Sequence, residues 1–219
     1  MFARRPSPIA SGPSTPEGAG LNEILFALTA FLRLFQTDPG PRLEGQKVFL
    51  RLPRLHDYKP WAELRARSAA FLRPWEPTWP EDDLTRPAFR ARLNAYAREL
   101  EVGEAFPFFM FRRDDGALIG GVRLFHIRRG VSQTAVMGYW IGQAHARQGY
   151  MQDGVRAAID FAFGELALHR LEAACMPENE PSAAVLLKSG FAEEGYAPAY
   201  LKINGEWRDH RLFGMVAPR

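Results

Sequence analysis

The residues best suited to chemistry lie between Tyr139 and Phe191, where a glycine turn separates a strand pattern from a helix pattern. The turn reads Ala-Arg-Gln-Gly-Tyr-Met over residues 146–151. Backbone N–H groups that converge at the start of a helix bind anions well, and glycine lets the chain approach a ligand closely. Arg147 adds a positive charge beside the turn. We therefore expect the turn to hold a phosphorylated cofactor, an ordinary strand-to-helix loop being the alternative.

The composition is that of an ordinary globular protein with a full core. The chain has 219 residues, of which 47% are hydrophobic and 24% charged, and its formal net charge is +3. Arginine is abundant but scattered, which favours a compositional bias over a surface for stable nucleic acid binding. One cysteine, Cys175, excludes an internal disulfide and a multi-thiolate metal site. The five histidines lack metal-binding spacing, so we expect no metal and a small buried thiol.

The N-terminal part is expected to lie outside the main domain. Residues 1–20 are rich in Pro, Ser and Gly and are predicted to be disordered. Residues 21–45 are predicted to form an apolar helix, over 21–36, and a linker. The helix is too short to span a bilayer, which needs about 20 residues, and the layout is not that of a signal peptide. We expect a cytoplasmic monomer or homodimer with no membrane attachment.

Periodicity predicts the elements that position the turn. Strand patterns cover Lys47–Leu52, Phe106–Arg113, Leu118–Ile127, Gln133–Gly142 and Leu171–Met176, and two strands follow Phe191 around an Asn204-Gly205 turn. Helix patterns cover Arg54–Leu72, Thr85–Glu101, Met151–Ala162 and Pro181–Lys188. An ordered loop with Trp75 and Trp79 lies between the first two helices. These patterns predict an α/β (α+β) domain over 46–219, with a mixed central sheet of about six or seven strands flanked by helices.

This order of elements, with four phrases, resembles the GNAT superfamily of acetyl-coenzyme A-dependent N-acetyltransferases over about Lys47–Val216. The phrases at 72–77, 176–182, 190–196 and 200–210 narrow the resemblance to the ribosomal-protein-alanine N-acetyltransferases of the RimJ type. They read Leu-Arg-Pro-Trp-Glu-Pro, Met-Pro-Glu-Asn-Glu-Pro-Ser, Gly-Phe-Ala-Glu-Glu-Gly-Tyr and Tyr-Leu-Lys-Ile-Asn-Gly-Glu-Trp-Arg-Asp-His. The turn departs from the superfamily pattern, Gln/Arg-x-x-Gly-x-Gly/Ala, at Ala146 and Met151. Contacts from the backbone of Gln148–Gln152 to a cofactor do not depend on these two side chains. The resemblance therefore still implies the GNAT fold.

The resemblance implies that acetyl-coenzyme A is the cosubstrate. It implies cofactor contacts from the strand end, the turn and the next helix, namely Trp140, Ile141, Gly142, Arg147, Gln148, Gly149, Tyr150, Met151, Gln152, Asn179, Ser182 and Lys188. The pantetheine arm is expected between the strand ending at Gly142 and the strand at Leu171–Met176, paired with exposed backbone. A backbone N–H near Ile141 would then polarise the thioester carbonyl.

The resemblance also makes Ser182 the expected catalytic residue. Leu186 occupies the position at which many superfamily members have a tyrosine acid, so Ser182 is the remaining proton donor to the departing thiolate. A thiol with a pKa of about 8.5 needs little help to leave, so a role as cofactor contact alone stays open. Asn179 is equally well explained as a helix N-cap. The general base is unassigned, because an α-amino group with a pKa of about 8 is partly neutral at pH 7.

Acceptor contacts are expected from Trp75, Glu76, Tyr139, Tyr200 and Asp209, although core packing explains a tryptophan as well.

The predicted reaction is acetyl transfer to a primary amine by direct attack in a ternary complex, because no nucleophile is paired with a base. The resemblance implies that the amine is the N-terminal alanine of a ribosomal protein. The alternatives are a small amine as acceptor and a non-catalytic module that binds acetyl-coenzyme A.

Overall fold

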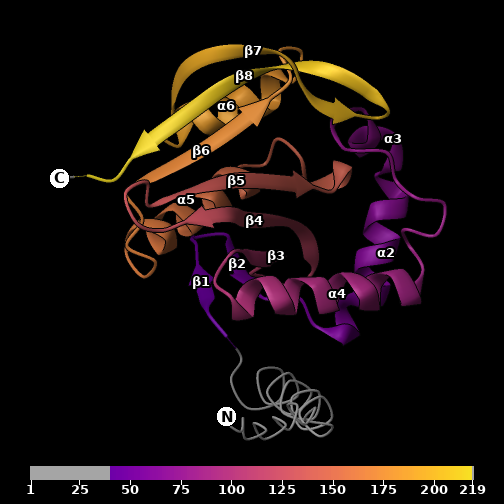
Figure 1. Ribbon diagram of the computed structural model, residues 1–219. Coiled ribbons are helices and arrows are strands. Elements are labelled where there is room, and N and C mark those ends of the chain that lie inside the picture. Colours follow the sequence, from indigo (N-terminus) through magenta and orange to yellow (C-terminus); the bar gives the residue numbers. More distant parts are fainter. Residues whose placement is uncertain (1–39, 219) are drawn as a thin grey trace, which may run out of the picture. The chain divides into compact units, whose positions relative to one another are not determined.

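The strand patterns come together in one mixed sheet. A computed structural model describes residues 40–218, and in this part of the chain eight strands pair in the order β1-β2-β3-β4-β5-β6-β8-β7 (Figure 1). The strands are β1 Arg42–Glu44, β2 Val48–Arg51, β3 Phe106–Arg112, β4 Leu118–Arg128, β5 Thr134–Ile141, β6 Arg170–Cys175, β7 Ala192–Ile203 and β8 Glu206–Val216. The predicted α/β (α+β) class and the mixed, helix-flanked sheet are confirmed.

Strand β1 is the one strand that the sequence does not predict, and it makes the count eight rather than six or seven. It lies in the segment assigned to the linker, and it pairs antiparallel with β2, Leu43 opposite Leu50. Leu43 is buried between two exposed neighbours, so the strand offers a single apolar position. One apolar residue gives no periodicity to detect. The predicted disorder of 1–20 and helix of 21–36 lie outside the described residues.

The helices also follow the sequence, with one correction. They are η1 Leu55–Asp57, α2 Tyr58–Arg67, α3 Ala69–Leu72, η2 Arg73–Trp75, α4 Arg86–Glu101, η3 Gln143–His145, α5 Tyr150–Phe163 and α6 Glu180–Lys188. The continuous helix predicted over Arg54–Leu72 is wrong, because Ser68 leaves helical geometry (φ −102°, ψ 7°). The Ser68 hydroxyl is buried there and accepts a hydrogen bond from the N–H of Gln143, at 3.0 Å. A tertiary contact therefore divides the helix.

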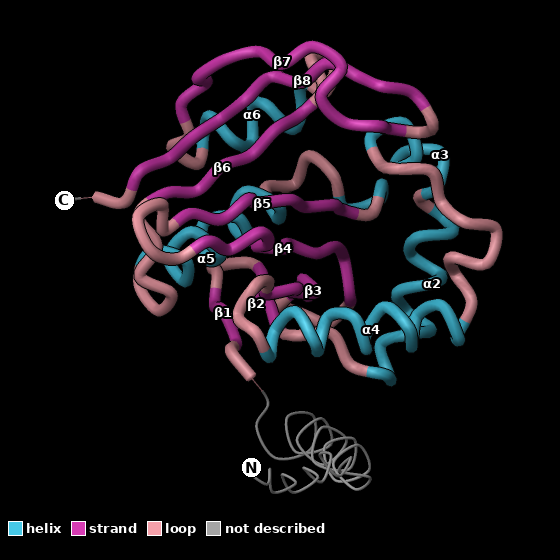
Figure 2. The backbone as a smooth tube through the Cα atoms, viewed as in Figure 1, coloured by secondary structure: helices cyan, strands magenta, loops and turns pink. Residues whose placement is uncertain are grey.

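Helices cover both faces of the sheet. In the view of Figure 2, α4 lies in front of the strands, and α5 and α6 lie behind them. Strand β3 shows why both faces are apolar: Phe108 and Met110 pack into the core shared with α5, while Phe109 and Phe111 pack into the core shared with α2 and α4. Successive side chains of a strand point to opposite faces, so an unbroken aromatic run suits a strand that is buried on both sides.

The carboxylate of Asp153 connects α5 to the turn between β1 and β2, at one edge of the sheet. Asp153, in the first turns of α5, accepts hydrogen bonds from three successive backbone N–H groups of the β1–β2 turn. The donors are Gln46 at 3.1 Å, Lys47 at 2.8 Å and Val48 at 3.1 Å. A carboxylate is an acceptor only, so it satisfies three donors without conflict. The start of α5 is thus fixed to the β1–β2 turn.

We expect Asp153→Asn to lower the free energy of unfolding by about 1–3 kcal/mol. An amide NH₂ group would face backbone donors, and the charge that strengthens the three hydrogen bonds would be lost. Urea unfolding measures the change. Asp160→Asn, an exposed position of the same helix with the same change of charge, is the control. Equal stability of both variants would show that this contact does not hold the turn.

Candidate functional site

The site begins where two neighbouring strands separate. Strands β5 and β6 run parallel and pair through Thr134–Val136 and Arg170–Glu172, and their pairing stops there. Strand β5 continues to Ile141, paired on its other side with β4, and β6 continues to Cys175, paired with β8. Figure 1 shows the two arrows diverging toward this end of the sheet. The edge of β5 after Val136 therefore faces a gap.

The register shows which backbone groups face this gap. The N–H of Gly142 donates to the carbonyl of Ile119, at 2.9 Å, so the backbone groups of Gly142 point toward β4. Neighbouring residues of a strand point their N–H and C=O groups to opposite sides. The N–H of Ile141 consequently points toward β6. An extended ligand in the gap would meet donors and acceptors spaced as on a sheet edge.

The glycine turn lies at the end of the same strand. Arg147 and Gly149 both have left-handed backbone conformations, with φ of 60° and 82°. Gly149 is the N-cap of α5 and has no side chain that caps it, and the first N–H bonded within the helix is that of Asp153. The N–H groups of Tyr150, Met151 and Gln152 therefore precede the intrahelical bonds, as an anion site requires.

Two further contacts hold the turn in place. The Lys47 ammonium donates to the carbonyl of Gln148, at 3.2 Å, and adds a positive charge that the sequence analysis did not assign. The side-chain amide of Gln152 donates to the carbonyl of Lys188, at 3.3 Å, which joins α5 to the end of α6. Phosphate groups fit this arrangement of N–H groups and cations. Arg147, Gln148 and Gly149 are exposed to solvent at the turn.

Ser182 lies at the gap with Tyr139 and Cys175. The Tyr139 hydroxyl is 2.9 Å from the Ser182 hydroxyl and donates to the Ser182 carbonyl, at 3.1 Å. Since this donation uses the tyrosine proton, the serine hydroxyl is the donor of the pair. Burial raises the pKa of Tyr139 well above its ordinary value and also raises the pKa of the Cys175 thiol. Both groups are therefore neutral near neutral pH.

The start of α6 has the geometry expected of a capped helix. The Asn179 side chain accepts a hydrogen bond from the N–H of Ser182, at 3.2 Å, so the capping role is present. Leu186 is 1% exposed and lies in the core, consistent with the absence of a tyrosine acid at that position. Ser182 remains half-buried, on the face of the sheet that Tyr139 occupies.

Two of the residues predicted for binding have other partners. The Trp140 side chain packs on the opposite face of the sheet, against the core of α2 and α4, and its backbone groups point toward β4 like those of Gly142, so Trp140 does not face the gap. Glu76 forms a two-point ion pair with Arg65, at 2.8 and 2.5 Å, and accepts from Trp79 Nε1, at 2.7 Å. Arg65 is 7% exposed and lies 4.1 Å from the Trp79 ring centre and 5.0 Å from that of Trp140. Glu76 thus holds the loop that carries Trp75 and Trp79 against α2.

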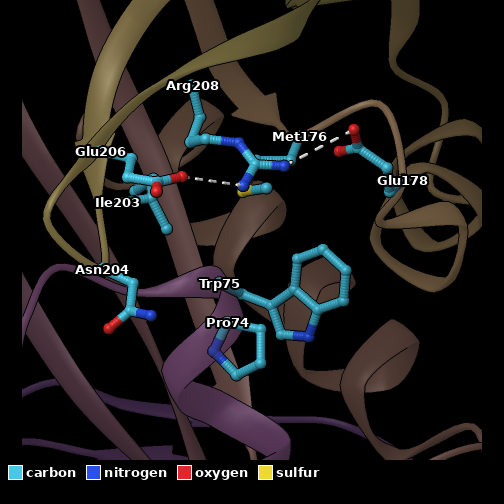
Figure 3. A pocket seen from close by; sticks show the side chains of 8 residues that line it. All are labelled: Pro74, Trp75, Met176, Glu178, Ile203, Asn204, Glu206 and Arg208. Carbon is cyan, nitrogen blue, oxygen red and sulfur yellow. Dashed lines mark ion pairs between the residues drawn. The ribbon is translucent and has the colours of Figure 1, made fainter.

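A pocket of about 290 Å³ lies beside the end of β6, between this loop and the β7–β8 hairpin. It is lined by Pro74, Trp75, Met176, Glu178, Ile203, Asn204, Glu206 and Arg208. Figure 3 shows Arg208 between the two glutamates, with Trp75 and Pro74 on the opposite side of the pocket. The N–H of Asn204 donates to the carbonyl of Glu76, at 3.0 Å, which joins the two walls. Of the predicted acceptor residues, Trp75 lines this pocket.

Two more of the five predicted acceptor residues, Tyr200 and Asp209, lie on the hairpin outside the pocket lining. The Tyr200 ring packs edge-on against His210, with 5.7 Å between ring centres. Asp209 accepts from the Tyr196 hydroxyl, at 2.5 Å, and from the N–H of Ala199, at 2.7 Å. Asp209 therefore stabilises the irregular part of β7 near Ala197–Leu201, where the pairing register shifts. The sequence does not indicate that Glu178, Glu206 and Arg208 line a common pocket. Glu178 follows β6 and the other two belong to β8, and no short-range pattern connects these segments.

Nothing in the described part of the chain resembles a metal centre. Among residues 40–218, no group of three or more His, Cys, Asp or Glu side chains is placed to hold a metal ion. In the same range, no helix is long and apolar enough to cross a membrane.

Comparison with known proteins assigns a family to this arrangement. Residues 47–192 match the model of the acetyltransferase (GNAT) domain. Probable N-acetyltransferase YjcK of Bacillus subtilis is 38% identical over 176 residues, which cover 80% of this chain and 97% of that protein. [Ribosomal protein uS5]-alanine N-acetyltransferase of Escherichia coli is 35% identical over 182 residues, covering 82% and 93%. The solved structure of Mycobacterium smegmatis RimJ in complex with CoA-disulfide superposes with a TM-score of 0.75 at 31% identity, covering 81% and 86%.

We expect Glu76→Gln to destabilise the fold by about 1–3 kcal/mol, because the nearly buried Arg65 guanidinium would lose its charged partner. Thermal or urea unfolding measures the loss. Glu81→Gln, an exposed position a few residues further on, is the control. A Glu76→Gln variant with native stability and reduced affinity for the acceptor would instead assign this carboxylate to substrate binding.

Proposed function

The chain belongs to the GNAT acetyltransferase family, and on this premise we propose that it transfers acetyl from acetyl-coenzyme A to the N-terminal alanine of a ribosomal protein. The enzyme class, an N-acetyltransferase related to the ribosomal-protein N-acetyltransferases, follows from the family match and the relatives. The acceptor is the proposed part. It is supported by the 35% identity, over 82% of the chain, to an enzyme named for the alanine of ribosomal protein uS5. This acceptor implies a cytoplasmic site of action.

The observation that carries the cofactor assignment is the gap between β5 and β6, together with the glycine turn that follows β5 and starts α5. An extended pantetheine arm suits the open backbone edge of β5, and a pyrophosphate suits the N–H groups at the start of α5. Of the predicted cofactor contacts, we propose backbone roles for Ile141 and for Gln148–Gln152. Arg147, Lys47 and Lys188 are the cations proposed to lie near the phosphates.

The same geometry supports a direct-transfer mechanism. The N–H of Ile141 donates to the thioester oxygen as the acceptor nitrogen attacks the carbonyl carbon. The C–N bond forms, the C–S bond breaks, and the departing sulfur takes the proton of the Ser182 hydroxyl. In the absence of a ligand the Ser182 hydroxyl donates to the Tyr139 oxygen, which keeps it beside the gap; for the transfer it turns to the sulfur, and Ser182 then regains a proton from water. The attacking amine is the neutral fraction that a pKa of about 8 leaves at pH 7, and the proton that its nitrogen sheds once the C–N bond has formed goes to water.

The acceptor assignment is tested by acetyl transfer from radiolabelled acetyl-coenzyme A across a panel. The panel holds peptides that start with Ala, Ser or Met, the same peptides with a blocked amino group, and small amines. We expect transfer to the free Ala-starting peptides to exceed transfer to the other peptides and to the small amines. Efficient transfer to a small amine, with none to any Ala-starting peptide, would overturn the acceptor and keep the enzyme class.

The role of Ser182 is tested by Ser182→Ala. We expect kcat to fall about 10- to 100-fold, at the lower end of general acid catalysis because a thiolate is a good leaving group. Binding of coenzyme A, measured by calorimetry, should stay within about threefold of the wild type. Tyr139→Phe retains the ring and removes the hydroxyl, so we expect a smaller loss of kcat from a less well-oriented serine. Full turnover of Ser182→Ala, with normal binding of coenzyme A, would exclude the acid role.

A further inference from the structure

The pocket beside β6 holds two carboxylates, Glu178 and Glu206, whose side chains are 61% and 77% exposed and so accessible to a ligand. Glu178 and Glu206 accept no hydrogen bond from any residue between 40 and 218, and within this range each forms an ion pair with Arg208. The Arg208 guanidinium is 3.6 Å from a Glu178 oxygen and 3.7 Å from a Glu206 oxygen, beyond hydrogen-bond distance. One guanidinium is therefore shared loosely by two acids.

The other acidic side chains near the pocket are occupied. Glu76 is held by Arg65 and Trp79, and Asp209 by Tyr196 and Ala199. These contacts are 2.5–2.8 Å long and use the oxygens of both carboxylates. A cation that enters the pocket consequently finds free oxygen lone pairs on Glu178 and Glu206.

We infer that Glu178 and Glu206 receive the protonated amine of the acceptor, and that Arg208 is a counter-ion which the amine displaces. The inference rests on the proposed function and names the residues that select its substrate. Two carboxylates and one guanidinium leave the pocket a formal charge of −1, which attracts an ammonium group. The Trp75 ring supplies the opposite wall, and an aromatic face also favours a cation.

The location suits a substrate-positioning role. Met176 lines the pocket and follows Cys175, the last residue of β6, while Glu178 precedes the helix cap Asn179. The pocket therefore adjoins the segment that carries Ser182. An amine held here is poised to lose its proton to water and to move toward the thioester. Glu178 and Glu206 select the acceptor by charge in this scheme and do not take its proton.

If the inference holds, removing a glutamate and removing the arginine change the KM for the acceptor in opposite directions. We expect Glu178→Gln and Glu206→Gln each to raise the KM for the acceptor about two- to fivefold, as loss of an exposed ion pair would, and the double variant to raise it further. We expect Arg208→Gln to lower the KM about two- to threefold, because a competing cation is removed. The KM for acetyl-coenzyme A should not change. The control is Glu193→Gln, an exposed glutamate that pairs with Arg211 of β8 outside the pocket.

Binding without turnover separates this inference from the proposed acceptor. Calorimetry on the complex with coenzyme A would compare an Ala-starting peptide with its N-acetylated form, and spermidine with diacetylspermidine as small-amine probes. The wild type should prefer the free amine in at least one pair, and the double glutamine variant should lose that preference. Preference for spermidine alone would overturn the peptide acceptor and keep the pocket assignment. No preference for a free amine in either pair, or a raised KM for Arg208→Gln, would overturn the pocket assignment itself.

Discussion

An unpaired backbone edge inside a sheet is expensive, because every buried N–H and C=O group needs a partner. This domain keeps such an edge on β5, where the pairing with β6 stops after three residues on each strand. The surrounding elements make the gap stable. Strand β6 is paired with β8 along its whole length, and β5 is paired with β4. The start of α6 brings Ser182 to Tyr139 beside the gap, so the remaining open groups are those that a ligand would use.

Carboxylates have two distinct roles in this chain. Asp153 and Glu76 each accept three hydrogen bonds, of 2.8–3.1 Å and 2.5–2.8 Å, and each fixes a segment that forms one side of the site. Glu178 and Glu206 share one distant guanidinium and keep their acceptor capacity. The side-chain partners, rather than the residue type, distinguish a carboxylate that builds the site from one that is free to bind.

The sequence predicts those parts of the site that depend on local chemistry. The glycine turn, the N-cap at Asn179 and the hairpin turn at Asn204-Gly205 are short signals, and the structure has each of them in place. The break at Ser68 was not predictable, since it depends on a hydrogen bond to Gln143. The partner of Glu76 is likewise distant, because Arg65 lies on another element and its position depends on packing against two tryptophans. The pocket unites three segments that share no periodicity.

The hydrogen bond from Asn204 to Glu76 joins segments from opposite ends of the domain. The proposed acceptor pocket takes one wall from the Trp75 loop and the other from Ile203, Asn204, Glu206 and Arg208. Recognition of the proposed acceptor therefore depends on contact between the Trp75 loop and the final hairpin, so it belongs to the entire domain rather than to either half.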